Sequence, residues 1–471
     1  MDRYPSKLDA GISGKDSPPS DGFAHLSIDA DAHYQTLEGF GAAVAWYAET
    51  FAAFPDGSPV YDLAFRDLGL DIIRFRNRYG RQDKNNSSDI TAEARILQQA
   101  TLSLGHAPKV LLSSWSPPGS LKASGLENCS NDKTTCTLAK DSSGQFVYDQ
   151  FATYFVNALK YYAASGIRPD YLSIQNEPDY VPNGWEGCYF LPSESANYPG
   201  YDRALSAVHS ALGTTSAAPR FIGPESYSLS SSSLGSFQMS AIDDLLYGIA
   251  HHMYQSNYWR TPDNYLVSMQ DADSASNGLP LLETEFDAPG DNNTSGGFET
   301  AWVMHNALAV EGVSAFLYWS LVWPGTTTQT PGGLIWLTYA QDPTQPPNYA
   351  ARAQYYAVRH FARFTDPGFV RVSAQSNSND VRASAYLSPD ASQLTIVVLN
   401  VGVSDAQVKI DAINNFTAAA SETYMSIFRE GDAGTSEYWN DLGTVKPNLP
   451  LTMPSQSVAT LVLYTDTPDA Q

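Results

Sequence analysis

Basic side chains are scarce in this sequence of 471 residues. It has 27 Lys and Arg against 50 Asp and Glu, which gives a formal net charge of −23. Nucleic-acid binding requires clustered Lys and Arg at the phosphates, so a nucleic-acid ligand is disfavoured. A membrane partner is disfavoured too, because an anionic surface attracts basic segments and no run of about 18 apolar residues could cross a bilayer. The charge suits a protein that acts on a neutral or weakly charged substrate.

Cysteine is also rare, with three residues in the whole chain. Cys129 and Cys136 lie close together in a stretch rich in Asn, Ser, Thr and Asp, where they can form a short disulfide. Cys188 is then left over. Metal binding is the weaker interpretation because no histidines follow at ligand spacing, and we expect neither a metal nor another cofactor.

Residues 1–22 lack the apolar core of a signal peptide and are rich in Ser, Pro, Gly and Asp, so we expect a flexible leader there. Asn-x-Ser/Thr sequons cluster in polar, loop-like stretches, which favours a secreted eukaryotic glycoprotein. The six sequons begin at Asn85, Asn86, Asn128, Asn292, Asn293 and Asn415.

We expect this protein to be a monomer.

From about residue 37, short apolar runs alternate with longer helical patterns, as in the βα repeats of a parallel sheet. Eight βα units that close on themselves form a (β/α)8 barrel, or TIM barrel, of about 250 residues or more. The sequence therefore predicts an α/β fold with its active site at the carboxyl ends of the strands. The eight predicted strands are Leu37–Val44, Leu70–Phe75, Val110–Trp115, Tyr171–Glu177, Phe221–Glu225, Ile249–Tyr254, Leu281–Phe286 and Val313–Trp319.

Beyond Pro367 the pattern changes to runs in which apolar and polar residues alternate, which predicts an attached antiparallel β-sandwich. Ala24–Ala30 alternates in the same way ahead of the barrel and is expected to add a strand to that sandwich. The runs beyond Pro367 are Val381–Leu387, Leu394–Val401, Val408–Ile413, Glu422–Phe428 and Val458–Tyr464. The predicted organisation is a leader at 1–22, a sandwich strand at 23–35, the catalytic barrel at 36–365 and the sandwich at 366–471.

Two glutamates lie at the ends of apolar runs that are predicted to be buried strands, Glu177 in the fourth and Glu285 in the seventh. A carboxylate there is costly unless it is paired or hydrogen-bonded. Cleavage of a glycosidic bond uses two carboxyl groups, one to protonate the leaving oxygen and one to attack carbon. The alternative is a pair of structural acids that cap neighbouring helices. Glu283 is a second candidate for the attacking group, because residues two apart share a face of a strand.

Several other strand ends carry residues suited to sugar binding. Trp46, Trp115 and Trp319 offer flat apolar faces on which pyranose rings can stack, although each can equally be a core aromatic. Arg74 could hold a catalytic carboxylate in its ionised form, or it could form an ordinary salt bridge of the barrel.

His252 and Tyr254 end the sixth predicted strand. Tyr254 could donate a hydrogen bond to the nucleophile. A lone histidine such as His252 is more often a satisfied core residue, and His251 remains unassigned.

The ordered set of motifs resembles glycoside hydrolase family 30 over nearly everything from about residue 24 onwards. Asn-Glu-Pro alone is shared by many barrel glycosidases, but the ordered set is much more specific. The matching stretches are Gly39-Phe40-Gly41, Trp115-Ser116-Pro117-Pro118, Ser173 to Asp179, Gly223-Pro224-Glu225-Ser226, His252-Met253-Tyr254, Thr284-Glu285, His305-Asn306-Ala307 before Trp319, and the junction Pro367 to Arg371.

This resemblance implies roles for the candidate residues. In that family the fourth-strand glutamate, here Glu177, is the acid/base and the seventh-strand glutamate, here Glu285, is the nucleophile of a retaining reaction. Asn176 matches the residue that hydrogen-bonds the sugar 2-hydroxyl. The segments Asn176 to Tyr180 and Trp185 to Cys188, with Gly-Pro-Glu-Ser on the fifth strand, look most like the branch that cleaves β-1,4-xylan or xylooligosaccharides.

One stretch departs from the bacterial glucuronoxylanases of the family. They resemble one another in an arginine pair after the eighth-strand tryptophan, which grips a glucuronic acid branch. Val322 and Trp323 occupy those positions here and cannot form a bidentate carboxylate clamp. Together with the sequons, this indicates the fungal-type xylanase branch, which includes endo and exo enzymes. Arg78 or Arg81 could replace the pair if a branched substrate were required.

Three alternatives stay open. Two are other activities of the same family, an endo-β-1,6-glucanase and a glucosylceramidase-like β-glucosidase. The third is a carbohydrate-binding protein on a barrel scaffold, against which the presence of both Glu177 and Glu285 argues.

Overall fold

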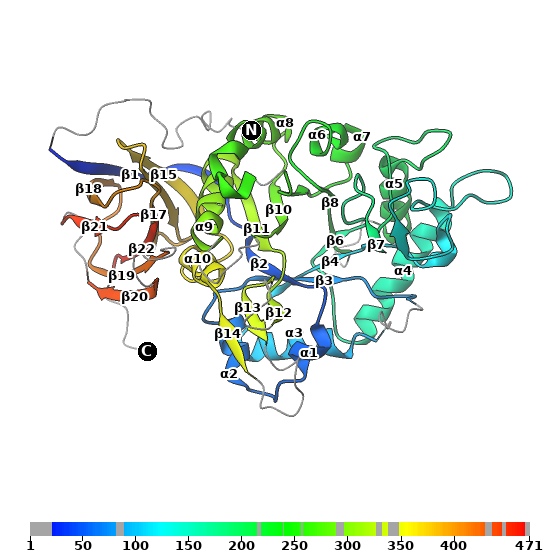
Figure 1. The fold of residues 1–471 in the computed structure, drawn as a ribbon, viewed down its shortest axis with the longest axis horizontal. Coiled ribbons are helices and arrows are strands. Elements are labelled where there is room, and N and C mark those ends of the chain that lie inside the picture. The colour runs from blue at the N-terminus through cyan, green and yellow to red at the C-terminus, as the bar shows by residue number, and fades with distance from the viewer. Residues whose placement is uncertain are drawn as a thin grey trace.

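The computed structural model has two bodies, a barrel and a side domain built on a large sheet (Figure 1). Asn128 and Asn415 are exposed, and the other four sequons lie outside the described residues. None of the described helices is long and apolar enough to cross a membrane. The structure describes residues 21–81, 89–213, 218–238, 240–255, 258–288, 296–325, 332–337, 348–428, 436–444 and 449–466.

Eight parallel strands form a closed barrel in the order β10-β11-β2-β3-β4-β6-β8-β9, which confirms the predicted (β/α)8 fold. Each strand begins within two residues of its predicted start, because the apolar runs coincide with the buried strand segments. The strands are β2 (Gly39–Val44), β3 (Ile72–Arg76), β4 (Lys109–Ser113), β6 (Tyr171–Ser173), β8 (Arg220–Ser226), β9 (Gly248–His252), β10 (Leu281–Phe286) and β11 (Val313–Tyr318).

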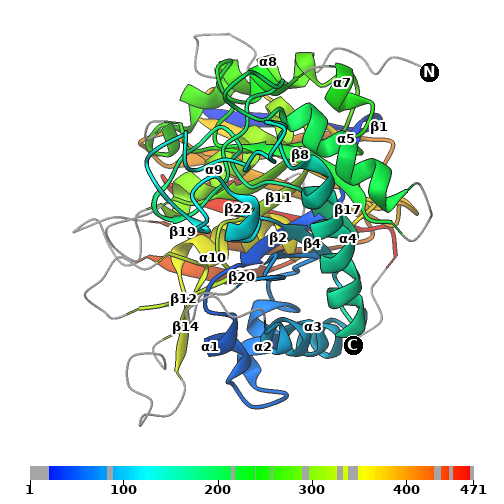
Figure 2. The ribbon, with the colours of Figure 1, turned by 90° about the vertical axis from the view of Figure 1, so that its right-hand side faces the viewer.

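Helices surround the barrel, and Figure 2 shows α3, α4 and α5 along one side of it. In α4, Phe151, Phe155, Ala158 and Tyr162 are buried at spacings of three and four, which gives the helix one apolar stripe against the strands. The helices are α1 (Ala48–Ala52), α2 (Pro59–Ala64), α3 (Thr91–Leu104), α4 (Tyr148–Ala164), α5 (Tyr201–Leu212), α6 (Leu234–Phe237), α7 (Ser240–Asp243), α8 (Leu266–Ala275), α9 (Gly297–Asn306) with a π-helical continuation η5 (Ala307–Glu311), α10 (Ala353–Ala362), and the 3-10 turns η2 (Gly119–Leu121), η3 (Tyr258–Arg260) and η4 (Pro262–Tyr265).

A layer of buried side chains from seven of the eight strands fills the barrel interior. On the remaining strand, β2, a Cβ added at Gly41 would lie 2.4 Å from the carbonyl oxygen of Ile72 and 2.9 Å from Leu317 Cγ. Glycine is therefore needed there for β3 and β11 to approach β2. The packed interior leaves the carboxyl ends of the strands as the place for a site. The layer consists of Ile72, Leu111, Tyr171, Ile222, Ala250, Leu282, Ala315 and Leu317.

The side domain is a nine-stranded sheet in the order β20-β19-β22-β17-β16-β15-β1-β18-β21. Strand β1 lies ahead of the barrel in sequence and joins this sheet, where it pairs antiparallel with β15 and parallel with β18. The predicted antiparallel side domain is confirmed, and β1 with β18 is the one parallel pair among the described strands of this sheet. The strands are β1 (Phe23–Thr36), β15 (Val370–Ser376), β16 (Val381–Leu387), β17 (Gln393–Asn400), β18 (Ala406–Asn414), β19 (Ala420–Ile427), β20 (Glu437–Gly443), β21 (Leu451–Met453) and β22 (Ser457–Tyr464).

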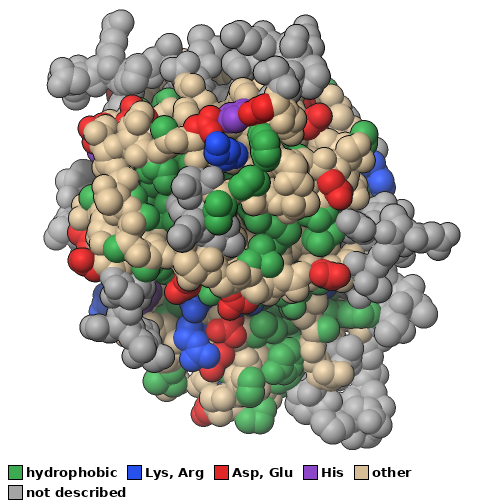
Figure 3. Space-filling view, turned by 90° about the vertical axis from the view of Figure 1, so that its left-hand side faces the viewer, with side chains coloured by type: hydrophobic (Ala, Val, Ile, Leu, Met, Phe, Trp, Pro, Cys, Tyr) green, Lys and Arg blue, Asp and Glu red, His purple; other side chains and the backbone are tan. Residues whose placement is uncertain are grey.

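The sheet folds over itself, because side chains from strands near its two ends share one core. Val408 of β18 and Met453 of β21 belong to the same buried cluster as Met425 of β19 and the central residues Leu26 and Ile396. Figure 3 views the side-domain end of the molecule, where charged side chains stand singly or in small groups among hydrophobic and other uncharged surface. This surface agrees with a charged-residue content of 16% for the whole chain.

Two small sheets lie outside these bodies. One contains β12 (Val322–Pro324), β13 (Ile335–Leu337) and β14 (Tyr349–Ala351), and it follows the last barrel strand. The other is a two-stranded ribbon of β5 (Asn128–Ser130) and β7 (Asn183–Glu186). The predicted Cys129–Cys136 disulfide is present at this ribbon, and Cys188 is free and buried.

Candidate active site

The two glutamates singled out in the sequence both line one cavity at the carboxyl ends of the barrel strands. Glu285 lies within β10, as expected. Strand β6 ends at Ser173, so Glu177 lies in the turn beyond the strand rather than at its end. The predicted strand was too long because Ile174 continues the apolar run although the ladder has already stopped.

Glu177 has a left-handed backbone, with φ at 48°, and so has Glu225 at the end of β8, with φ at 58°. The amide of Glu177 donates to the carbonyl oxygen of Glu225 at 2.9 Å, which joins the two turns. A left-handed non-glycine residue costs about 1–3 kcal/mol, and such strain is frequent at functional sites. The turn therefore holds the Glu177 carboxyl in a position that a regular strand would not provide.

The carboxyl groups of Glu177 and Glu285 face each other across His252. His252 Nδ1 lies 3.1 Å from Glu177 Oε1, and His252 Nε2 lies 3.9 Å from Glu285 Oε2. One side-chain ligand atom from each of the three residues lies within 4.8 Å of the other two. This spacing is close to the roughly 5–5.5 Å of retaining pairs and shorter than the roughly 6.5–9.5 Å of inverting pairs.

Arg74 and Tyr254 hold the Glu285 carboxyl from two sides. Arg74 Nη1 donates to Oε2 at 2.5 Å, and the Tyr254 hydroxyl donates to Oε1 at 3.0 Å. Arg74 is fully buried in the middle of β3, and its Nη2 also donates to Asn176 Oδ1 at 2.6 Å. Four of the predicted site residues are thereby joined in one hydrogen-bonded network.

These contacts give the two acids different proton affinities. Burial raises the pKa of Glu177 well above its ordinary value, and the charge of Glu285 raises it further. Burial raises the pKa of Glu285 to about 7, and the charge and hydrogen bond of Arg74 and the hydrogen bond of Tyr254 keep it from rising further, so Glu285 loses its proton before Glu177 does. Burial and Arg74 lower the pKa of His252, which is therefore neutral. The arrangement favours a protonated Glu177 beside an ionised Glu285.

Glu225 is a further acid of the site, and no role was predicted for it. Its carboxylate is fully buried, lies 3.0 Å from Arg74 Nη2, and accepts a hydrogen bond from Ser113 Oγ at 3.1 Å. Arg74 therefore lies between two carboxylates. The only sequence signal was the position of Glu225 inside the Gly-Pro-Glu-Ser motif.

Glu283 and His251 lie away from the cavity. Glu283 is buried, and its Oε1 accepts a hydrogen bond from the Glu285 amide at 3.1 Å. The pairing of β10 with β9 is irregular between Glu283 and Glu285, and only the latter lines the cavity. His251 is buried, with its Nε2 2.5 Å from Glu311 Oε1, which indicates a structural pair.

The cavity has a volume of about 790 Å³ and a largely aromatic wall. Trp115 lies between Trp46 and Trp319, with ring centroids 6.3 and 6.0 Å away. Arginine side chains lie against two of these rings, Arg76 at 3.9 Å from Trp46 and Arg74 at 4.5 Å from Trp115. The lining residues are Trp46, Tyr47, Glu49, Thr50, Arg76, Arg78, Trp115, Glu177, Tyr180, Trp185, Tyr227, Tyr254, Glu285, Asp287, Trp319 and Trp323.

The two positions of the missing arginine pair contribute no cation to the cavity. Val322 is buried in β12, and Trp323 lines the cavity as an aromatic. Arg78 also lines it, but its guanidinium is paired with Glu49 and lies 2.7 Å from Glu93. Arg81 is buried and paired with Glu186, so it does not line the cavity.

Among the residues that the structure describes, Glu177, His252 and Glu285 form the one group of acids and histidines close enough together to hold a metal ion. Arg74 already donates to Glu285, and its fixed positive charge opposes a cation at that oxygen. The geometry therefore suits proton transfer and nucleophilic attack by the carboxyl pair better than metal binding.

Comparisons with known proteins relate the whole chain to carbohydrate-cleaving enzymes. No family model matches the chain. It is 23% identical to the glucuronoxylanase XynC of Bacillus subtilis over 464 residues, covering 93% of this chain and 91% of the relative. It is 24% identical to the endo-1,6-beta-D-glucanase neg1 of Aspergillus fumigatus over 458 residues, covering 86% and 87% of the two chains.

A solved structure shows the same fold. The catalytic domain of GH30 xylanase C from Talaromyces cellulolyticus superposes with a TM-score of 0.69 at 19% identity, covering 94% of this chain and all of the other. The comparisons together support a glycoside hydrolase of the family 30 type, and the relatives differ in the polysaccharide that their names specify.

Proposed function

We propose that this glycoside hydrolase of the family 30 type cleaves β-1,4-xylosidic bonds in xylan or xylooligosaccharides with retention of configuration. It would belong with the fungal-type xylanases that lack the arginine pair. The observation that carries the proposal is the facing pair of Glu177 and Glu285 in a cavity walled by tryptophans.

In the first step, the ionised Glu285 attacks the anomeric carbon while Glu177 gives its proton to the glycosidic oxygen. The bond between carbon and the leaving oxygen breaks, and the sugar becomes esterified to Glu285. Arg74 and Tyr254 keep the attacking carboxylate charged and aligned. Asn176, to which Arg74 donates, would hydrogen-bond the 2-hydroxyl of that sugar, the role that the family resemblance implies.

In the second step, Glu177 acts as a base on water, which attacks the same carbon and releases Glu285. The change of role follows from charge. While Glu285 is ionised, its charge raises the pKa of Glu177. Once Glu285 is esterified that charge is gone, so the pKa of Glu177 falls and the group can accept a proton from water after losing its own.

Xylan is proposed as the substrate because the Bacillus relative is a glucuronoxylanase and the motifs after Glu177 resemble the xylan-cleaving branch. A second candidate, endo-β-1,6-glucanase activity, is favoured by the Aspergillus relative. We also propose that the protein is secreted. The exposed sequons support this location, and so does the disulfide, because disulfides persist in oxidising compartments.

A panel of polysaccharides tests the substrate. We expect release of xylooligosaccharides from linear xylan, arabinoxylan and glucuronoxylan, and no products from β-1,6-glucan or glucosylceramide. Products from β-1,6-glucan alone would replace the first candidate with the second. Binding of xylooligosaccharides without turnover would instead indicate a carbohydrate-binding protein.

A further inference from the structure

A row of four aromatic rings leads from the nucleophile to the surface of the cavity. The Tyr227 ring lies 5.6 Å from Tyr254, whose hydroxyl donates to Glu285. Tyr180 stacks on Tyr227 with centroids 4.8 Å apart and planes within 11°, and Trp185 lies 6.4 Å further along at 28°. All four rings line the cavity, and Trp185 is 46% exposed.

The row lies on the side of the acid. Tyr180 follows β6 and Tyr227 follows β8, so both come from barrel strands adjacent to the turn that carries Glu177. The Tyr180 amide donates to the Glu177 carbonyl oxygen at 3.1 Å. The tryptophans Trp46 and Trp319 follow β2 and β11, in the other part of the barrel. Because the acid protonates the leaving oxygen, the leaving group lies on the side of the cavity that Tyr180 and Tyr227 line.

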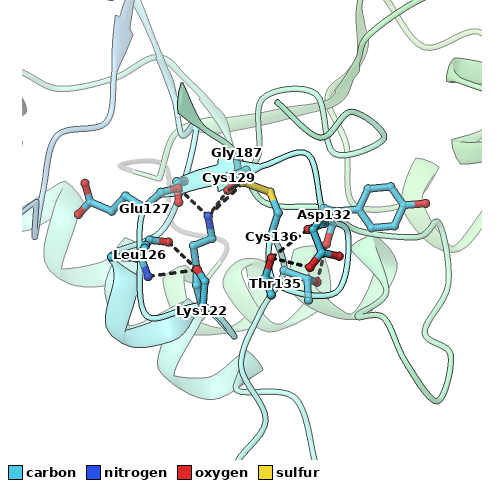
Figure 4. The surroundings of a disulfide bond; sticks show 12 residues. Lys122, Leu126, Glu127, Cys129, Asp132, Thr135, Cys136 and Gly187 are labelled. Carbon is cyan, nitrogen blue, oxygen red and sulfur yellow. Dashed lines mark hydrogen bonds between the residues drawn. A yellow bond between two sulfur atoms is a disulfide. The ribbon is translucent and has the colours of Figure 1, made fainter. Parts of the chain in front are cut away.

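The outer ring of the row stands on a cross-linked ribbon. Trp185 belongs to β7, which pairs with β5, the strand that carries Cys129 of the disulfide. Lys122 is buried, and its Nζ donates to the carbonyl oxygens of Glu127 and Gly187 at 2.6 Å each (Figure 4). These bonds join the two strands at one end of the ribbon, where Asn128 pairs with Glu186. An exposed indole is thereby fixed in place before a ligand arrives, which reduces the entropy lost on binding.

The next residue ties the ribbon to the barrel. Glu186 is 2% exposed, accepts a hydrogen bond from Arg76 at 2.8 Å and is also paired with Arg81. Arg76 in turn lies over the Trp46 ring on the opposite wall. The position of Trp185 is therefore set by the same arginines that set the tryptophan wall.

We propose that Tyr227, Tyr180 and Trp185 form a binding platform for the sugar residues on the leaving-group side of the scissile bond. Tyr227 and Tyr180 stack on each other, so they meet a sugar at their edges, whereas the half-exposed Trp185 has apolar surface on which the C–H face of a sugar can pack. The inference rests on the proposed function and deepens it. Sugars bound on both sides of the bond make the interior of a polysaccharide the preferred point of cleavage.

The test compares two substrates in the full chain. Xylohexaose places sugars on the platform, whereas an aryl β-xylobioside has no sugar beyond the cleaved bond. Trp185→Ala and Tyr180→Ala should lower kcat/KM on xylohexaose by about tenfold and leave the aryl xylobioside within about twofold. Leu126→Ala is the matched control, because Leu126 is 65% exposed beside the same ribbon and does not line the cavity.

Rescue separates stacking from damage to the ribbon. Trp185→Tyr keeps a flat ring and should recover most of the lost activity on xylohexaose. Equal losses on both substrates, no loss in either alanine variant, or the same loss in the Leu126→Ala control would each overturn the platform.

Failure of the proposed function gives a different result. In that case the unaltered protein turns over neither xylan substrate, and the comparison is made with a β-1,6-glucohexaose and an aryl β-glucoside. A selective loss on the hexaose would then support the platform although the xylan assignment had failed. A loss shared with the aryl glucoside would overturn the platform too.

Discussion

At the scale of single residues, the partners of the two catalytic candidates differ. Arg74 and Tyr254 donate to Glu285, whereas Glu177 has the neutral His252 beside it. Both carboxyl groups are largely buried, with 12% of the Glu177 side chain and 8% of the Glu285 side chain exposed. Identical side chains at similar burial therefore acquire opposite protonation states from their neighbours.

The nucleophile can be identified by substitution. Glu285→Gln should abolish hydrolysis, whereas azide should rescue Glu285→Gly by attacking from the face that the carboxylate vacated, which gives a glycosyl azide of inverted configuration. Product analysis by NMR measures the configuration. Glu283→Gln is the control and should retain activity. An inactive Glu283→Gln together with an active Glu285→Gln would reverse the assignment.

The acid can be identified by the dependence on the leaving group. Glu177→Gln should slow xylooligosaccharide hydrolysis far more than hydrolysis of an activated aryl glycoside, because only the former needs protonation. In the unaltered enzyme, activity should fall as the pH rises through the raised pKa of Glu177, since its proton is then lost. Glu177→Gln should lack this basic limb on the aryl glycoside. Equal losses on both substrates would remove Glu177 from this role.

Val322 and Trp323 in place of an arginine pair predict little preference for glucuronate-branched xylan. Without a clamp, kcat/KM on linear xylohexaose should lie within about tenfold of that on a glucuronate-branched analogue, or roughly 1.4 kcal/mol in transition-state binding. A charge-assisted clamp would add about 1.5–3 kcal/mol per hydrogen bond. A preference of roughly a thousandfold for the branched substrate would indicate that another cation, such as Arg78 in the cavity wall, has taken over the role.

At the scale of elements, the strand starts could be predicted and several strand ends could not. The run at Leu281–Phe286 coincides with β10, because burial and hydrogen bonding stop at the same residue. The run that ends at Glu177 passes β6 by four residues, because apolar content reports burial and not the ladder. Strand β20 contains four polar or glycine residues in seven, so no apolar run marks it although it belongs to the ladder.

The candidate site likewise contains residues that could be predicted from the sequence and residues that could not. The places of Glu177, Glu285 and the tryptophans in the barrel could be predicted, since Glu285 lies within β10 and the others follow the carboxyl ends of their strands by one to four residues. Glu225 and the row Tyr180, Tyr227 and Trp185 could not be assigned from sequence, because their roles depend on neighbours from other strands. Pairings of this kind arise only when the barrel closes.

Gly41 of β2 provides a test of the barrel packing. Gly41→Ala should destabilise the protein by about 1–3 kcal/mol, because the added Cβ meets the backbone oxygen of Ile72 at 2.4 Å. Thermal inactivation curves measure the change. Gly235→Ala in α6 is the control, since its Cβ would meet nothing closer than 3.6 Å, and it should cause no loss. Equal stability of the two variants would contradict the packing described for β2.

At the scale of the whole molecule, a buried histidine lies where the barrel meets the side domain. His360 on α10 has Nδ1 2.8 Å from Thr460 Oγ1 of β22 and Nε2 2.8 Å from Ser426 Oγ of β19. Burial lowers the pKa of His360 to about 3, with a smaller contribution from Arg359. The contact between the two bodies therefore requires a neutral imidazole.

This requirement predicts acid sensitivity. The unfolded chain takes up a proton at His360 below a pKa of about 6.5, whereas the folded chain does not do so until about pH 3. The contribution of His360 to the free energy of unfolding is therefore fully present above pH 6.5. Below pH 6.5 the free energy of unfolding falls by about 1.4 kcal/mol per pH unit. His360→Gln should show a smaller drop in Tm between pH 7 and pH 5 than the unaltered protein, and the exposed His33→Gln should show the same drop. An unchanged drop in His360→Gln would contradict this account.

Strand β1 has a consequence for biosynthesis. Its two neighbours, β15 and β18, are encoded after the entire barrel, so β1 leaves the ribosome long before either partner exists. At about 5–20 residues per second, translation of the intervening chain takes tens of seconds. During that time Leu26 and Ile28, both fully buried in the finished sheet, have no native partner strand. The nascent chain therefore exposes an unpaired apolar segment to which a chaperone can bind. The side domain can fold only when the last part of the polypeptide has emerged.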